Sequence, residues 1–116
     1  MSREWRMYLE DMRSFCDRIL SYSSNLSREE FDSHQLAYDA IVRNIELLGE
    51  AARKIPEEVR AQAPDVEWLK IIALRNILVH GYFGLDDDIL WDVVQNRANT
   101  LRSALLYFGK KIIVTQ

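Results

Sequence analysis

The chain has 116 residues, 48% of them hydrophobic, and a formal net charge of −3 from 15 Lys and Arg against 18 Asp and Glu. This length predicts a single domain spanning residues 1–116. The negative charge excludes the global basic field that drives nonspecific binding to nucleic acids. A phosphate partner must therefore be held locally, by a few arginines in a cleft.

Composition also indicates where the protein works. No run of 18 apolar residues occurs, and charged residues interrupt the N-terminal stretch in which a signal peptide needs an apolar core. We therefore expect a cytoplasmic protein that does not contact a membrane. The single cysteine, Cys16, excludes an intramolecular disulfide and a cysteine-based metal cluster, and we expect it in the core.

The first half of the chain predicts helices. Apolar residues at steps of three and four predict a first helix over about residues 3–22. Ser27 and Glu30 have the spacing of a capping box, so a second helical region should open near Ser27. An apolar stripe then continues to an expected helix end near Lys54, before Pro56. Gly49 lies inside that helix at a cost of about 1 kcal/mol relative to alanine, so we expect another helix to approach closely there.

The second half is also helical by its pattern. A short helix should follow Pro56, and residues 68–79 are apolar nearly all the way round, which predicts a helix buried between others. Asp86 or Asp87 should cap the last helix, whose apolar residues recur at steps of three and four up to an end near Lys110 and Lys111. No segment alternates like a strand, so the predicted fold is all-α, an antiparallel bundle of four or five helices.

One short stretch, RNILVHGYF at residues 75–83, combines Arg75, Asn76, His80 and Tyr82. A histidine can take the proton from a ribose 2′-hydroxyl or protonate the leaving oxygen, and an arginine can stabilise the extra negative charge on phosphorus. The expected products are a 2′,3′-cyclic phosphate and a 5′-hydroxyl. This chemistry requires neither a metal nor another cofactor, and its dependence on the 2′-oxygen selects RNA over DNA.

The spacing of Arg75 and His80 leaves an alternative open. Five positions correspond to about 7.5 Å along a helix and about 140° around it, so the two side chains meet only if the helix loosens before Gly81 or a second subunit supplies the complementary half. A histidine before a helix-ending glycine is also a common C-terminal cap, and the spacing alone favours that interpretation. A charged arginine in an apolar helix, however, needs a carboxylate, carbonyl groups or a bound phosphate.

Candidate carboxylates lie on the preceding long helix. Arg43, Glu46, Glu50 and Arg53 share one face, and the like-charged pair Glu46 and Glu50 is unfavourable unless a cation answers it. Arg75 is a candidate for that cation. The alternative is a solvated charged face, which we favour for the outer members. The only other histidine, His34, is expected to be exposed.

Three blocks of the sequence resemble the HepT-like HEPN toxins. They are the motif RNILVHGY, of the form R-x4-H-x-Y, the upstream RNIELLGEAARKIP, and the surrounding LRNILVHGYFGLDDDILWDVV. The resemblance runs from about Tyr38 to the last helix. It implies a helical bundle that dimerises with its motifs facing across a cleft and acts as a metal-independent endoribonuclease.

The resemblance also implies roles for single residues. Arg75 and His80 match the catalytic pair, Asn76 lies beside the cleft, and Tyr82 matches the tyrosine that an MNT-type nucleotidyltransferase antitoxin modifies with AMP. Without this resemblance, Tyr82 could close the loop over the core, a role that we expect of Phe83. Two other hypotheses are a noncatalytic helical partner of a nucleotidyltransferase, which the acidic balance favours slightly, and a purely structural bundle, which leaves Arg75 unexplained.

Overall fold

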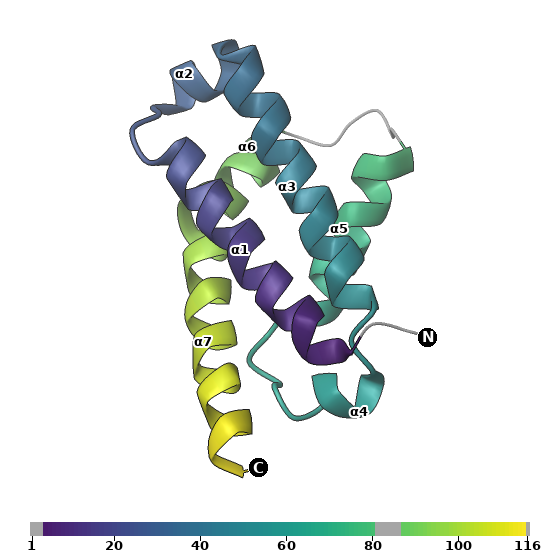
Figure 1. Ribbon diagram of the computed structural model, residues 1–116. Coiled ribbons are helices and arrows are strands. Elements are labelled where there is room, and N and C mark those ends of the chain that lie inside the picture. Colours follow the sequence, from purple (N-terminus) through teal and green to yellow (C-terminus); the bar gives the residue numbers. More distant parts are fainter. Residues whose placement is uncertain (1–3, 81–86, 116) are drawn as a thin grey trace.

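The computed structural model describes residues 4–80 and 87–115, and these residues form a bundle of helices without a strand (Figure 1). This confirms the predicted all-α fold. The elements in chain order are α1 (Trp5–Ser23), α2 (Arg28–Ser33), α3 (Gln35–Arg53), α4 (Glu57–Arg60), α5 (Trp68–His80), α6 (Asp87–Asp92), the π-helical η1 (Val93–Arg97) and α7 (Ala98–Thr115).

Helix α3 is the centre of the arrangement. It packs against α1 on one side and α5 on the other, and α7 packs along α1 (Figure 1). The core lies mainly between α1, α3 and the α6–η1–α7 segment, and its largest fully buried side chains are Phe31, Met12, Ile19, Ile41, Ile45, Ile55, Leu90 and Cys16. Cys16 is therefore a core residue, as predicted, and burial raises the pKa of its thiol to about 12.

Local signals in the sequence fix several helix ends. Ser27 Oγ accepts a hydrogen bond from the amide of Glu30 at 3.1 Å, and the Glu30 carboxylate accepts one from the amide of Ser27 at 3.0 Å, which confirms the capping box. His34 is exposed, as predicted, and its Nδ1 caps α3 by accepting a hydrogen bond from the amide of Ala37 at 3.2 Å. Helix α3 ends at Arg53, one residue before its predicted end.

The prediction that residues 68–79 form a helix buried between others is wrong. In α5 only Trp68 is buried, whereas Leu69 is 76% exposed and Val79 is 45% exposed. The physical reason is that α5 packs chiefly against α3, so its outer side is open in the single chain. The all-round apolar pattern thus provides an uncovered apolar face.

The C-terminal region departs from its prediction in two ways. Asp87, one of the two predicted caps, is the first residue of α6 and not its cap, and Asp86 lies outside the described residues. A π-helical segment, η1, interrupts the predicted single helix. The helix also continues to Thr115 instead of ending near Lys110 and Lys111, because the helical path keeps Ile112 packed against the core.

No helix in the described part of the chain combines the length and the apolar composition that a bilayer span requires.

Candidate functional site

Helices α3 and α5 approach each other closely at Gly49. A Cβ atom at this position would overlap the Cβ of Arg75 and would lie 2.8 Å from Arg75 Cγ and 3.0 Å from the carbonyl oxygen of Ile71. Only glycine leaves room for α5 here. This confirms the predicted close approach and explains how the motif arginine reaches α3.

Arg75 lies in the seam between α3 and α5, with its side chain 19% exposed. Its Nη2 is 2.8 Å from Glu50 Oε2, and its Nη1 donates a hydrogen bond to Asn76 Oδ1 at 2.9 Å. The predicted ion pair between Arg75 and the carboxylates of α3 is thus confirmed, and Glu50 is the partner. The pair offsets the desolvation free energy of placing a guanidinium group in a largely apolar helix.

Glu50 is shared with a second arginine. Arg53 Nε donates to Glu50 Oε2 at 3.1 Å and Arg53 Nη2 donates to Glu50 Oε1 at 3.0 Å, a two-pronged pair. The hydrogen bonds from Arg53 lower the pKa of Glu50, and the charges of Arg53, Arg75 and Lys54 lower it further against the opposing effect of burial. One carboxylate therefore faces two guanidinium groups, which leaves positive charge at the seam.

The remaining candidates on α3 lie apart from this cluster. Arg43 Nη1 is 3.7 Å from Glu46 Oε2, and the Arg43 side chain is largely exposed. Glu46 thus pairs with Arg43, while Glu50 pairs with Arg75. For Arg43, the solvated-face alternative describes the structure better than a direct contact with the motif.

His80 is the last residue of α5 and is exposed. Because α5 stays helical through His80, its side chain points about 140° away from that of Arg75. Of the two conditions under which they could meet, loosening of the helix is not seen in the residues described. Asn76 is exposed, and it lies on the side of α5 between those of Arg75 and His80. Gly81, Tyr82 and Phe83 lie outside the described residues, so the expectations for Tyr82 and Phe83 remain predictions.

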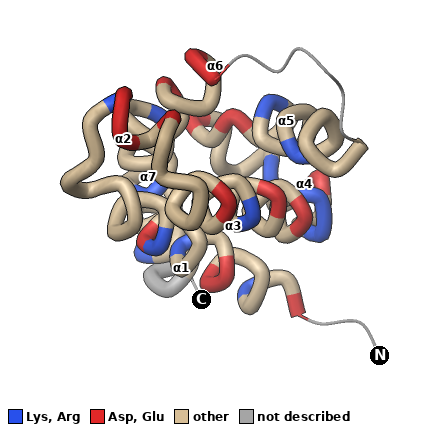
Figure 2. Tube along the Cα trace, turned by 90° about the horizontal axis from the view of Figure 1, so that it is seen from above, with Lys and Arg blue, Asp and Glu red and all other residues tan. Residues whose placement is uncertain are grey.

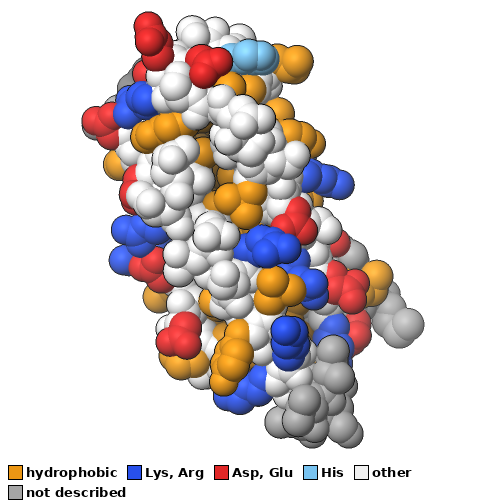
Figure 3. Space-filling view, turned by 90° about the vertical axis from the view of Figure 1, so that its left-hand side faces the viewer, with side chains coloured by type: hydrophobic (Ala, Val, Ile, Leu, Met, Phe, Trp, Pro, Cys, Tyr) orange, Lys and Arg blue, Asp and Glu red, His pale blue; other side chains and the backbone are white. Residues whose placement is uncertain are grey.

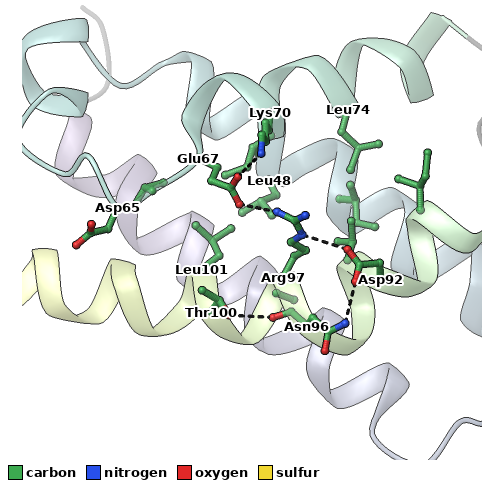
Figure 4. A pocket seen from close by; sticks show the side chains of 16 residues that line it. Leu48, Asp65, Glu67, Lys70, Leu74, Asp92, Asn96, Arg97, Thr100 and Leu101 are labelled. Carbon is green, nitrogen blue, oxygen red and sulfur yellow. Dashed lines mark hydrogen bonds and ion pairs between the residues drawn. The ribbon is translucent and has the colours of Figure 1, made fainter.

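A groove of about 500 Å³ lies on another side of α5, between α5 and the α6–η1–α7 segment (Figure 4). Arg97 crosses it: its Nη1 is 2.7 Å from Glu67 Oε1, and its Nε is 3.1 Å from Asp92 Oδ2. The apolar side chains that line the groove include Ile45, Leu48, Val66, Ile71, Leu74, Ile89, Val93 and Leu101. The lining of the groove includes Leu74 but not Arg75, Glu50 or His80.

The sequence analysis missed this groove. Asp92 and Arg97 are five positions apart, and residues at that spacing share a face only where the helix widens to the π form that η1 adopts. Asn96 adds a hydrogen bond from Nδ2 to Asp92 Oδ1 at 2.8 Å. The one available signal is this cluster of an acid, an amide and an arginine within six positions.

Within residues 4–80 and 87–115, no three His, Cys, Asp or Glu side chains are grouped so that they could hold a metal ion.

Comparison with known proteins places this chain in a family. A family model described as "Ribonuclease HepT-like" matches residues 12–108. The chain is 32% identical over 93 residues to "Putative RNase MJ1380" of Methanocaldococcus jannaschii, a match that covers 80% of this chain and 85% of the relative. It is 29% identical over 102 residues to "Probable ribonuclease HepT" of Thermococcus cleftensis, which covers 88% and 93% of the two chains.

A bacterial relative, "Putative RNase TTE0752" of Caldanaerobacter subterraneus subsp. tengcongensis, is 33% identical over 89 residues, 77% of this chain and 80% of its own length. No solved structure matches the chain significantly. The family match spans α3, the Arg75 cluster and the groove. The chain therefore belongs to the HepT-like family of ribonucleases, RNA-cleaving enzymes built on a HEPN-type helical bundle.

Proposed function

We propose that this protein is a metal-independent endoribonuclease toxin whose site is formed by Arg75 and His80 in a cleft between two copies of the chain. The observation that carries the proposal is the seam at Glu50, where one carboxylate is shared by Arg75 and Arg53. An arginine that shares a carboxylate with another cation keeps attraction for a phosphate. Glu50 is then the residue that orients Arg75, with Asn76 bracing its Nη1.

The reaction follows from the two side chains. The ribose 2′-oxygen bonds to phosphorus, its proton passes to the imidazole of His80, and the bond from phosphorus to the 5′-oxygen breaks as that oxygen takes up a proton. Arg75 stabilises the charge that develops on the phosphoryl oxygens. The products are a 2′,3′-cyclic phosphate and a 5′-hydroxyl.

The uncovered face of α5 supports a homodimer. Leu69, Ala73 and Ile77 recur at steps of four on the outer side of the helix, and His80 continues the same side. A two-fold dimer that covers this stripe would bring the second copy's His80 to the motif region, which resolves the 140° separation within one chain. We expect a dimer at micromolar concentration in analytical ultracentrifugation, and a strictly monomeric protein would contradict this site.

Neutralisation by a nucleotidyltransferase completes the proposal. Tyr82 follows His80 by two residues, so an AMP group on its hydroxyl would place bulk and negative charge beside the scissile phosphate. Coexpression with a neighbouring MNT-type nucleotidyltransferase should add AMP to the protein, as read by intact mass, and should relieve growth arrest. The Tyr82→Phe variant should stay unmodified and toxic in the same cells.

The decisive experiment is cleavage of total cellular RNA by the purified protein in chelator, beside His80→Ala prepared identically. We expect fragments with cyclic phosphate ends from the parent and none from the variant. If the folded parent, free of AMP by intact mass, cleaves nothing, the noncatalytic partner of a nucleotidyltransferase becomes the better hypothesis. The observation behind that alternative is the chain's net charge of −3, which disfavours general RNA binding.

A further inference from the structure

The C-terminal end of α3 gathers positive charge around Glu50. Arg53 and Arg75 both bind this carboxylate, and Lys54, the residue that caps α3, acts on it through its charge. Two guanidinium groups thus contact one carboxylate, and Lys54 follows Arg53 in the chain, in a protein whose overall charge is −3. This is the kind of local cationic site that an acidic protein needs in order to hold a polyphosphate chain.

Arg53 keeps donors available for a ligand. Its pair with Glu50 uses Nε and Nη2, which are two of the three nitrogens of the guanidinium group, and its side chain is 47% exposed. The same forked geometry that binds a carboxylate binds a phosphate. Arg53 can therefore hold Glu50 with one edge while it binds an RNA phosphate with another.

The opposite end of the seam is acidic. Helix α6 begins with Asp87 and Asp88, and the nearby α2 carries Asp32, so this end presents carboxylates to an approaching RNA (Figure 2). Arg28 is already engaged by Asp32 and Asp88. An RNA strand at Arg75 is thus repelled by the acidic α6 end of the seam and attracted toward the C-terminal end of α3.

The face formed by α1, α2 and α7 carries mixed charge. Basic and acidic side chains lie beside each other on it among apolar ones (Figure 3), as in the ion pair between Arg102 and Asp17. Cations that are matched by neighbouring acids add little attraction for a polyanion.

We propose that Arg53 and Lys54 bind the RNA phosphate next to the one held by Arg75, so that the substrate strand runs along the α3–α5 seam toward the C-terminal end of α3. The inference rests on the proposed assignment of Arg75 and His80. Glu50 acts as a positioning residue in it, because its carboxylate sets the spacing between the two guanidinium groups. When Arg75 binds the scissile phosphate, Arg53 retains Glu50.

The test is binding of a fluorescent single-stranded RNA oligonucleotide to the full chain in the His80→Ala background, measured by anisotropy over a series of salt concentrations. Each lost phosphate contact should reduce the slope of log affinity against log salt by about 0.7. We therefore expect Arg53→Ala and Lys54→Ala each to lower the slope by about this amount, and Arg53→Ala to weaken binding about tenfold at low salt.

Matched variants separate a phosphate contact from a structural effect. Arg53→Lys keeps the charge and should keep most of the slope, whereas Arg102→Ala removes an exposed guanidinium from the α1–α7 face and should leave both slope and affinity unchanged. Lys54→Ala alters an exposed side chain and serves as the test if Arg53→Ala fails to fold. Unchanged slopes in both Arg53→Ala and Lys54→Ala would overturn the inference.

Cleavage assays distinguish this inference from the function beneath it. With His80 present, Arg53→Ala should raise KM about tenfold with little change in kcat, the signature of lost substrate binding. If His80→Ala cleaves RNA like the parent, the assignment of the site is wrong. If His80→Ala is inactive but Arg53→Ala and Lys54→Ala bind and cleave like their parents, the RNA path is wrong and the site stands.

Discussion

Arg75 and Arg97 each form ion pairs that link α5, or the segment before it, to another helix. The two arginines differ in the number of carboxylates that they contact. Arg75 shares the single carboxylate of Glu50 with Arg53, and its side chain is 19% exposed. Arg97 contacts two carboxylates, those of Glu67 and Asp92, of which Glu67 also pairs with Lys70, and its side chain is 51% exposed. Positive charge is in surplus at the first arginine and is matched at the second.

The difference teaches how to interpret an arginine in an ion pair. At Arg97 the two acids neutralise the guanidinium, so its role is to tie η1 to the segment before α5 across the groove (Figure 4). At Arg75 the shared acid orients the guanidinium without neutralising the cluster. Only the arrangement at Arg75 retains attraction for the phosphate of a substrate.

The largest expected effect separates the two arginines by activity. Arg75→Ala should lower kcat for RNA cleavage about 10²–10³-fold, because it removes the group that stabilises the transition-state charge. Arg97→Ala should keep kcat within about twofold, because the charge of Arg97 is neutralised by Glu67 and Asp92. Single-turnover cleavage measures both, and equal losses in the two variants would remove the distinction.

The next largest effect concerns the close approach that places Arg75. Gly49→Ala should destabilise the fold by about 1–3 kcal/mol, because the new methyl group meets Arg75 Cβ and the Ile71 carbonyl. Gly109→Ala is the matched control on α7, where a Cβ meets nothing within 4 Å, and it should be neutral or stabilising by up to about 1 kcal/mol. Thermal unfolding of both variants provides the measurement. Equal stability of the two would show that α3 and α5 are not packed as described.

How far the sequence predicts these features depends on the range of the interaction. Periodicity and capping residues located α1, α2 and the end of α3, because those signals lie within a few positions of the structure they specify. Gly49 predicted a helix contact, and the like-charged pair on α3 predicted a partner for Arg75, because each is unfavourable without one.

Other features depend on neighbours that the pattern cannot name. The apolar residues of α5 predicted burial, but several of them are exposed. An apolar pattern indicates that a helix face is to be covered, and it does not tell whether the same chain covers it. The hydrogen bond from Tyr38 Oη to Asp87 at 2.8 Å joins residues 49 positions apart, and the π-helical η1 aligns a spacing that a regular helix separates. Such contacts follow from packing and not from local composition.

A smaller effect is expected from acid. The pKa of Glu50 is lowered in the folded state by Arg53, Arg75 and Lys54, so its contribution to stability is present above the unfolded-state pKa and is lost as pH falls through the folded-state value. The difference in Tm between the parent and Glu50→Gln should therefore shrink as pH is lowered from about 6 to about 3. A difference that stays constant across this range would mean that Glu50 is not held by the cations of the seam.

The smallest effect is expected at Arg97, and it tests the comparison most directly. A double-mutant cycle of Arg97→Ala and Glu67→Ala should give a coupling free energy of about 0.2–1 kcal/mol, because the pair is about half exposed and water screens it. The same cycle for Arg75→Ala and Glu50→Ala should give a larger coupling, since Arg75 lies deeper in the seam. If the two couplings are equal, burial does not separate the arginines, and the surplus of positive charge at the seam is the difference that distinguishes them.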